Sequence, residues 1–286
     1  MIRSKRFMGL LFPLTNGAPD NTIRISENER EAEMMYTKQD LMNHMAEMGI
    51  DPKGTLLVHS SMKSIGQVEG GADTVLDAMM EYMKDGLLIL PTHTWDRMGG
   101  EHPVFDADIT DSCVGLLTNR FRKREGVVRS LHPTHSVAAY GKDAEEYIAG
   151  EEKTGSPCPR EGCWGRLYDR KAQILMLGVT LSKYTYLHSV EEWADVPGRL
   201  TKQEIPLFVL DFEGNEYAVP QHRHAGANSD WFPKMDEEYL TRGAMKMGRF
   251  GDAVCRLCDA VKTADIALEW LKKDIDLFGN GDPLKR

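Results

Sequence analysis

The sequence of 286 residues predicts an α/β protein, a single domain with three layers (α/β/α) around a central sheet of mixed strand direction. Short, almost purely apolar runs are typical of strands buried on both faces, and they alternate with longer segments whose apolar residues recur every three or four positions, as in helices. No linker rich in Gly, Ser or Pro interrupts the chain, so we expect one domain over residues 36–286.

The first elements follow in the order helix, strand, helix, strand. Thr37 caps a helix that ends near Gly49, and it leads into a buried strand in "TLLVHSS" (residues 55–61). The segment "GADTVLDAMMEYMKDG" then forms a helix that ends at Gly86, and "LLILPTHTW" contains the next buried strand. A strand, a helix and a second strand in this order predict a βαβ unit with parallel strands.

The middle of the chain continues this alternation. A helix is expected in "SCVGLLTNRFRKREG", a polar loop and a short strand in "VVRSLHPTHSVAAYG", and a third buried strand in "KAQILMLGV". The segment "LFVLDFEGNEYAVP" alternates around the turn at residues 213–215, which predicts a hairpin and therefore a sheet of mixed direction.

The last fifty residues are expected to be mainly helical. Cys255 and Cys258 form a C-x-x-C inside "GDAVCRLCDAVKTADIALEWLKK", which has a helical pattern and no second cysteine pair for a zinc site. The five cysteines are an odd number and widely spread, so we expect reduced thiols and no disulfide framework.

Composition limits the classes of partner. The formal net charge of -9 argues against binding to nucleic acid or to an anionic membrane, and it is compatible with a cationic substrate. No apolar run is long enough to cross a bilayer, so we expect a cytoplasmic protein, with a homodimer as one assembly. Residues 1–35 show no sustained period and are expected to be an N-terminal extension, which a mobile arm would explain.

Three polar clusters each follow a predicted strand: "HSSMKSIG", "THTWD" and "YTYLHSVEE". Ligands of open α/β sheets bind beyond the carboxyl ends of strands, so the clusters predict one common site. In the first cluster Ser60, Ser61, Lys63 and Ser64 offer hydroxyls and a cation that suit a phosphate, and a serine-capped turn explains them equally.

Histidines carry the remaining candidate chemistry. In the third cluster His188 and Glu191 share a face of a helix near its start, where the dipole keeps imidazole neutral, and this suits a general base as well as a surface helix start. Arg129, His132 and His135 surround a proline turn, and His222 and His224 form an H-x-H, so a metal site is an alternative for both segments.

The order of these motifs resembles the aminoglycoside 3-N-acetyltransferase (antibiotic N-acetyltransferase) family over residues 36 to about 270. The resemblance implies transfer of an acetyl group from acetyl-coenzyme A (acetyl-CoA) to an amine, by direct attack and without a metal. It implies that His188 is catalytic, that Asp96 or Glu101 completes the polar group, and that the coenzyme lies along Ser60, Ser61, Ser64, Arg129, Ser130, His132 and Pro133.

The chain departs from the family pattern at two places that concern the acceptor. Tyr184, Thr185 and Tyr186 replace an Asn-Thr-Thr run of many members. No acid stands where the family has a hairpin glutamate, and Gln221, His222 or His224 is expected there. An aminoglycoside is therefore the first expected acceptor, and a different amine is the alternative.

Roles can be assigned to the remaining candidates. Thr185 is a candidate donor to the oxyanion, and Glu191 orients His188 or the incoming ammonium. A cationic small-molecule amine would bind near Asp96, Glu191 and Glu192. The rival classes are a domain that binds coenzyme A (CoA) or an antibiotic without turnover, and a metal-dependent hydrolase that uses some of His93, His132, His135, His188, His222 and His224.

Overall fold

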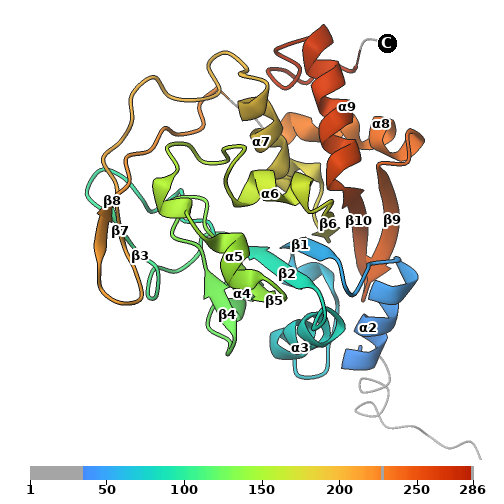
Figure 1. Cartoon of the computed structure of the whole chain (residues 1–286). Coiled ribbons are helices and arrows are strands. Elements are labelled where there is room, and N and C mark those ends of the chain that lie inside the picture. Colours follow the sequence, from blue (N-terminus) through green and yellow to red (C-terminus); the bar gives the residue numbers. More distant parts are fainter. Residues whose placement is uncertain (1–34, 227–228, 285–286) are drawn as a thin grey trace, which may run out of the picture. The chain divides into compact units, whose positions relative to one another are not determined.

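Seven strands form the central sheet, in the order β4–β5–β2–β1–β6–β10–β9 (Figure 1). The computed structural model describes residues 35–226 and 229–284, so nearly all of the predicted N-terminal extension lies outside the described residues. The strands are β1 (Thr55–Ser60), β2 (Leu87–Pro91), β4 (Val127–Arg129), β5 (Val137–Gly141), β6 (Gln173–Leu177), β9 (Met245–Phe250) and β10 (Ala253–Asp259).

Strand direction in this sheet is mixed. β1 pairs in parallel with β2 on one side and with β6 on the other. β5 is antiparallel to β2, and β10 is antiparallel to β6. The predicted βαβ unit is therefore present as β1, α3 and β2, and the centre of the sheet holds the three apolar strands that the sequence indicates.

Helices cover both faces of the sheet, which confirms the three-layer prediction (Figure 1). Alternate strand residues serve the two faces: Leu56 and Val58 pack with α2, α3 and α4, and Leu57 packs with the helices of the other face. The first face carries α2 (Lys38–Glu47), α3 (Ala72–Tyr82) and α4 (Leu116–Phe121). The second carries α5 (Ala144–Ile148), α6 (Cys163–Asp169), α7 (Tyr186–Trp193), α8 (Asp236–Thr241) and α9 (Ala260–Lys273).

The first described helix begins as the sequence predicts. The Thr37 side chain accepts a hydrogen bond from the backbone of Asp40, and the Asp40 side chain accepts one from the backbone of Thr37, so the two residues form a capping box. Gly49 follows the helix with a positive φ of 67°, a conformation that glycine adopts without strain.

The predicted hairpin is present, but it does not belong to the central sheet. β7 (Phe208–Leu210) and β8 (Glu216–Ala218) pair antiparallel, and β7 pairs in parallel with β3 (Val104–Asp106). This three-stranded sheet has its own small core around Phe105 and Val209. The hairpin is thus not what makes the central sheet mixed, because β4, β5, β9 and β10 run against their neighbours there.

The prediction of a mainly helical C-terminus is wrong. β9 and β10 form an antiparallel pair at the edge of the central sheet, and α9 follows β10 directly. Cys255 and Cys258 are three positions apart in β10, so their side chains lie on opposite faces of the sheet, in the two different cores. A shared zinc or redox role is therefore excluded by geometry.

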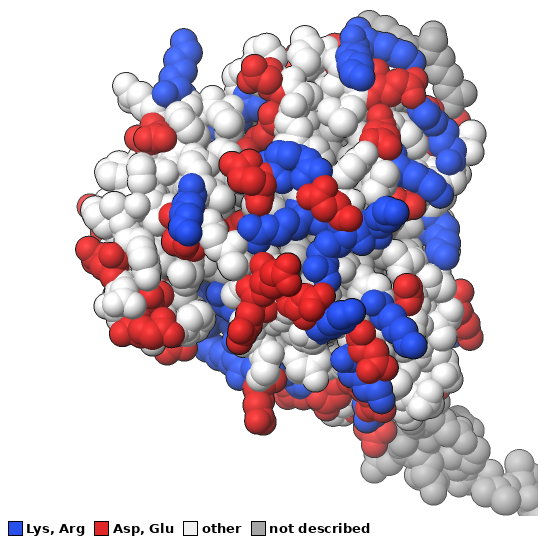
Figure 2. Space-filling model, viewed as in Figure 1, with Lys and Arg blue, Asp and Glu red and all other residues white. Residues whose placement is uncertain are grey.

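The described part of the chain contains no helix that is both long and apolar enough to cross a membrane. The face seen in Figure 2 carries basic and acidic side chains side by side, so neither sign of charge dominates it. Four short 3₁₀ turns complete the elements of the described residues: η1 (Met62–Ser64), η2 (Glu151–Lys153), η3 (Leu181–Lys183) and η4 (Ser229–Met235).

Candidate active site

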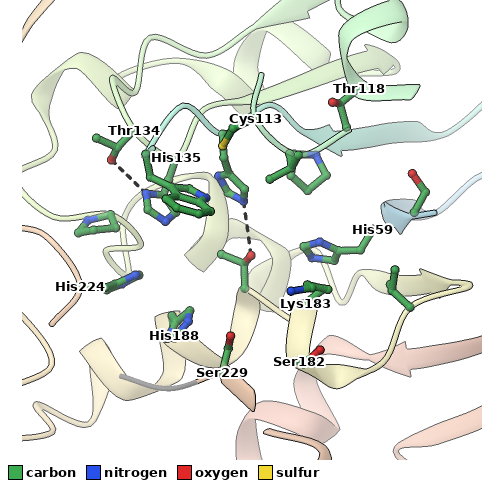
Figure 3. A pocket seen from close by; sticks show the side chains of 18 of the residues that line it. His59, Cys113, Thr118, Thr134, His135, Ser182, Lys183, His188, His224 and Ser229 are labelled. Atoms are coloured by element: carbon green, nitrogen blue, oxygen red, sulfur yellow. Dashed lines mark hydrogen bonds between the residues drawn. The ribbon is translucent and has the colours of Figure 1, made fainter. Parts of the chain in front are cut away.

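A cavity of about 570 Å³ opens beyond the carboxyl ends of β1, β2 and β6. All three predicted polar clusters reach it, through Ser60, His93 and His188, as the common-site prediction requires. Figure 3 shows His59, Ser182 and Lys183 on one side of the cavity and His188 and His224 on the other. The lining also includes Val58, Pro91, Trp95, Cys113, Val114, Thr118, Thr134, His135, Pro157, Val179, Thr185, Arg223 and Ser229.

His188 lies in the first turn of α7 with its ring in the cavity lining. Its Nδ1 is 3.0 Å from Oε2 of Glu191, one helical turn further along. A carboxylate only accepts, so we assign the proton to Nδ1, which leaves Nε2 as a proton acceptor. Nε2 has no protein partner among the described residues, and 15% of the side chain is exposed.

Glu191 does not line the cavity but lies behind His188. Its carboxylate is 1% exposed, and Oε1 accepts a hydrogen bond of 2.7 Å from Nε of Arg199. Arg199 also donates to the Gly226 carbonyl and to Asp276, so three partners fix its guanidinium. The pair of Arg199 and Glu191 therefore holds the imidazole of His188 in one orientation.

The next residue of α7, Glu192, holds a second imidazole. Its Oε1 lies 2.7 Å from Nε2 of His224, and its two oxygens also accept from the Ser156 hydroxyl and the Cys158 amide. The rings of His188 and His224 have centroids 4.6 Å apart. Of the three candidates for the place of the family's hairpin glutamate, His224 alone lines the cavity; Gln221 is buried, and His222 bonds to the Thr201 carbonyl.

Burial keeps most imidazoles of the cavity uncharged. It lowers the pKa of His59 to about 3, and it lowers the pKa of His93, His135 and His224 well below the usual value of histidine. His93 stacks on Trp164 with centroids 5.4 Å apart, and His59 stacks on the same indole at 6.1 Å. These imidazoles therefore present polar but neutral walls.

Thr185 also lines the cavity, at the N-terminus of α7. Its hydroxyl is 3.4 Å from Nε2 of His93, so a donor hydroxyl lies close to His188. The neighbouring Tyr184 and Tyr186 are fully buried in the core. Of the three residues that depart from the family's Asn-Thr-Thr run, only Thr185 therefore faces the cavity.

The serine-rich turn after β1 lies against the turn after β6. The Ser64 hydroxyl bonds to the Ser61 hydroxyl at 3.0 Å and to the Gly178 carbonyl at 3.2 Å. Ser60 lines the cavity; Ser61, Lys63 and Ser64 do not, and Lys63 is exposed. The second turn adds Ser182 and Lys183 to the lining, two residues that the sequence analysis did not single out.

The segment predicted to run along the coenzyme is largely buried structure. Arg129 is 2% exposed, and its guanidinium donates to Thr92, Ser136, Ala107 and Thr110. Burial lowers its pKa to about 9. The Ser130 hydroxyl accepts from the Val137 amide. Neither residue lines the cavity, so their proposed coenzyme contacts have no geometric support here.

His132 has a structural position as well. Its Nδ1 accepts from the amides of Thr134 and His135 at 3.1 and 2.9 Å, and its Nε2 donates to the Ser156 carbonyl at 2.9 Å. Burial lowers the pKa of this ring to about 4. Because both nitrogens are used, His132 fixes the loop and cannot contribute a metal ligand or a coenzyme contact without losing these bonds.

The predicted acids at the substrate side are not in the lining. The Asp96 carboxylate is 45% exposed and lies 3.8 Å from Nε of Arg97, although the neighbouring Trp95 lines the cavity. Glu101, the alternative, is exposed. Neither acid is brought together with His188 as the sequence analysis expected.

The six histidines of the rival metal hypothesis do not form a ligand set. Within the described residues, Cys158, Glu192 and His224 are the one group whose ligand atoms lie within 4.8 Å of one another, and only His224 belongs to the proposed set. Burial raises the pKa of the Cys158 thiol well above its usual value, so this thiol is protonated. His224 and Glu192 already satisfy each other, which accounts for the group without an ion.

The sequence analysis missed several lining residues. His59 and His93 stand inside quoted strand segments, but nothing local distinguishes a cavity histidine from a core histidine. Both have a buried ring nitrogen without a hydrogen-bond partner among the described residues, Nε2 in His59 and Nδ1 in His93. Arg223 and Cys113 reach the cavity from loops, and no local pattern marks them.

Comparison with known proteins gives a consistent family. A family model described as aminoglycoside 3-N-acetyltransferase matches residues 57–272. The chain is 25% identical over 255 residues to the SPbeta prophage-derived aminoglycoside N(3')-acetyltransferase-like protein YokD of Bacillus subtilis (strain 168), covering 82% of this chain and 92% of that protein. It is 26% identical over 264 residues to aminoglycoside N(3)-acetyltransferase IX of Micromonospora chalcea, covering 82% and 93%.

A solved structure agrees with these relatives. The apoenzyme of aminoglycoside acetyltransferase AAC(3)-IVa superposes with a TM-score of 0.72 at 26% sequence identity, covering 86% of this chain and 92% of that one. The family model spans most of the chain, and the fold and the order of motifs agree with it. The chain therefore belongs to the aminoglycoside 3-N-acetyltransferase family, whose members are acyltransferases.

Proposed function

We propose that this protein transfers an acetyl group from acetyl-CoA directly to an amine, with His188 as the general base. The observation that carries the proposal is the arrangement of Arg199, Glu191 and His188 behind the cavity wall, at distances of 2.7 and 3.0 Å. An imidazole held by a buried carboxylate, with its second nitrogen free and facing a cavity, is suited to take up a proton.

The proposed reaction is one displacement. The nitrogen of a free amine attacks the thioester carbonyl, its proton passes to Nε2 of His188, and the bond between carbon and sulfur breaks. The sulfur of the departing coenzyme then takes the proton from His188, so that the products are an amide and free CoA. Thr185 is the proposed donor to the oxyanion, because its hydroxyl lines the cavity near His188.

No cysteine is suited to form an acyl-enzyme intermediate. Cys113 is the one cysteine in the lining, and burial raises the pKa of its thiol to about 11. The thiol is therefore protonated at neutral pH, which favours direct transfer to the amine.

The two joined turns after β1 and β6 are the proposed coenzyme side. Ser60, Ser182 and Lys183 bring hydroxyls and one cation to the lining, and coenzyme A carries phosphates that such groups bind. A solved relative of the same fold, AAC-IIIb, is titled as a binary complex with CoASH. Lys183 thus takes the part that the sequence analysis gave to Lys63 and Arg129.

Aminoglycosides are the first acceptors to test. One related structure is titled as a complex of AAC(3)-IVa with a gentamicin and another as AAC-VIa bound to sisomicin. A different amine is the second candidate, and it is favoured by the substrate-side departures, since His224 stands in the lining where an acid was expected. The cytoplasmic location and the homodimer stay predictions.

The test is the release of free thiol from acetyl-CoA in the presence of a panel of amines that includes gentamicin, apramycin and sisomicin. We expect at least one amine to raise thiol release above the rate without an acceptor, with acetylated product confirmed by mass spectrometry. Coenzyme binding without acceptor-dependent release from a broad panel would instead support a binding protein. Stoichiometric zinc in the purified protein would support the hydrolase.

A further inference from the structure

The cavity lining contains no carboxylate in the described part of the chain. Its fully charged side chains are Lys183 and Arg223, and its imidazoles are mostly kept neutral by burial. The two residues of the gap between the described ranges, 227 and 228, are alanine and asparagine in the sequence and add no acid. The walls are thus neutral to positive, although the whole protein is acidic.

The nearest carboxylates are already engaged. Glu191 is paired with Arg199 and is 1% exposed. Glu192 accepts from Ser156, Cys158 and His224, and its side chain is 5% exposed. Asp96, outside the lining, is 45% exposed and lies near Arg97. None of the three presents a buried, unpaired negative charge to an acceptor.

This lining does not suit a polycation. An acceptor with several ammonium groups would lose water around each of them on entering the cavity, and that loss is offset only where a carboxylate or another acceptor replaces the water. Here the second and later ammonium groups would meet imidazoles, Lys183 or Arg223 instead. Like charges at this range weaken binding.

Arg223 gives the lining a specific anion-binding group. Its NH1 donates 2.9 Å to the Met98 carbonyl, and its NH2 donates to the Trp95 carbonyl, so the backbone fixes the guanidinium beside Trp95 and His224. A guanidinium has five N–H donors, and these two bonds leave further donors available. No carboxylate of the described residues forms an ion pair with Arg223, so its charge is not neutralised within this part of the protein.

We propose that the acceptor is an amine that also carries a carboxylate or a phosphate, and that Arg223 binds this anionic group while His188 receives the proton of the amine. The inference rests on the proposed acetyl transfer and narrows its acceptor. Lys183 lies on the other side of the cavity from His188 and His224, beside the hydroxyl-rich turns, and serves the coenzyme (Figure 3).

The test compares matched acceptors by thiol release. Glucosamine and glucosamine 6-phosphate differ by a phosphate, tyramine and tyrosine differ by a carboxylate, and gentamicin provides the polycation. We expect the anionic member of at least one pair to have a kcat/KM about tenfold or more above its partner and above gentamicin. We also expect its KM to rise with salt, because the attraction to Arg223 is screened.

Arg223→Gln should lower kcat/KM for the anionic acceptor about tenfold more than for its uncharged partner. Arg242→Gln, at the exposed end of α8, is the matched control and should leave that ratio unchanged. Gentamicin turnover equal to or above that of every anionic acceptor would overturn the inference and leave the proposed function intact. Thiol release with none of these amines or the broader panel would overturn the proposed function, and the inference with it.

Discussion

His188 and His224 lie with their rings 4.6 Å apart between centroids and inclined by 33°, each bonded to one of two consecutive glutamates. Glu191 holds the first ring and Glu192 the second, so a single turn of α7 orients both imidazoles of this wall. The two rings nevertheless differ, because burial lowers the pKa of His224 well below the usual value, and Nε2 of His224 is already bonded to Glu192. His188, with Nε2 free, is the better base of the two.

His188→Gln should lower kcat by about a hundredfold to ten-thousandfold and leave the affinity for acetyl-CoA unchanged, because the ring is the proton acceptor and lies across the cavity from the proposed coenzyme side. Steady-state kinetics and calorimetric titration with CoA measure the two effects. The control is His222→Gln, whose ring bonds to the Thr201 carbonyl outside the lining and should retain activity. A loss of less than tenfold in His188→Gln would remove this residue from the mechanism.

Lys183 and Arg129 should respond in opposite ways to substitution. Lys183→Gln is expected to raise the KM for acetyl-CoA about tenfold with little change in stability, since the side chain is exposed and contacts a phosphate in our proposal. Arg129→Lys should instead destabilise the fold by about 3 kcal/mol, because the buried acceptors around the guanidinium lose their donors. Urea unfolding and acetyl-CoA kinetics on both variants decide, and the reverse pattern would restore Arg129 as a coenzyme residue.

His132 should make the fold sensitive to acid. Its pKa is about 4 in the folded protein and about 6.5 when unfolded. The unfolded chain therefore binds more protons in this window, and stability falls as the pH drops from about 6.5 to about 4. His132→Asn should be less stable at pH 7, because it loses the bond to the Ser156 carbonyl, but between pH 7 and pH 5 it should lose about 2 kcal/mol less free energy of unfolding than the wild type. His102→Asn, at an exposed position, should keep the wild-type slope, and an equal slope in His132→Asn would contradict the prediction.

Glu151 has the opposite pH dependence. This carboxyl is 1% exposed, accepts 2.6 Å from the Cys163 amide through Oε1, and has no partner for Oε2 among the described residues. Burial raises its pKa to about 7. The folded state then binds more protons between about pH 4.5 and 7, so the wild type loses stability as the pH rises through this window.

Glu151→Gln keeps the Oε1 acceptor and removes the ionisation. The stabilisation of this variant over the wild type should therefore be about 2 kcal/mol larger at pH 8 than at pH 5, measured by urea unfolding at both pH values. Glu145→Gln at an exposed position of α5 should show no such difference. A pH-independent effect of Glu151→Gln would mean that this carboxyl is not the titrating group.

The centre of the fold could be predicted from the sequence because its signals are local. The apolar strands β1, β2 and β6 and the capped helix α2 each carry a complete pattern within a dozen residues. The edge pair β9 and β10 was not predicted, because β10 passes into α9 at Ala260 without a loop, and the helical period of α9 was extended back over Cys255 and Cys258. The position of the hairpin outside the central sheet depends on its pairing with β3, about a hundred residues earlier in the chain.

The candidate site divides in the same way. The sequence placed His188 and Glu191 one helical turn apart, and the structure joins them. It could not show that Arg199 neutralises Glu191, or that His59, His93, His135 and His224 share a cavity, because these contacts join segments that are distant in sequence. Arg129 was assigned to the coenzyme because charge and motif order do not distinguish an exposed guanidinium from one that is 2% exposed.

The state of the cysteines has a practical consequence for assays. All five are unpaired, and burial raises the pKa of each thiol, to about 11 for Cys113 and Cys255 and to about 12 for Cys258, with Cys158 and Cys163 well above their usual range. A colorimetric disulfide reagent reacts with thiolates, so the native enzyme should contribute almost no background to it. Denaturation would uncover all five sulfhydryls at once, and the same reagent would then count unfolded molecules.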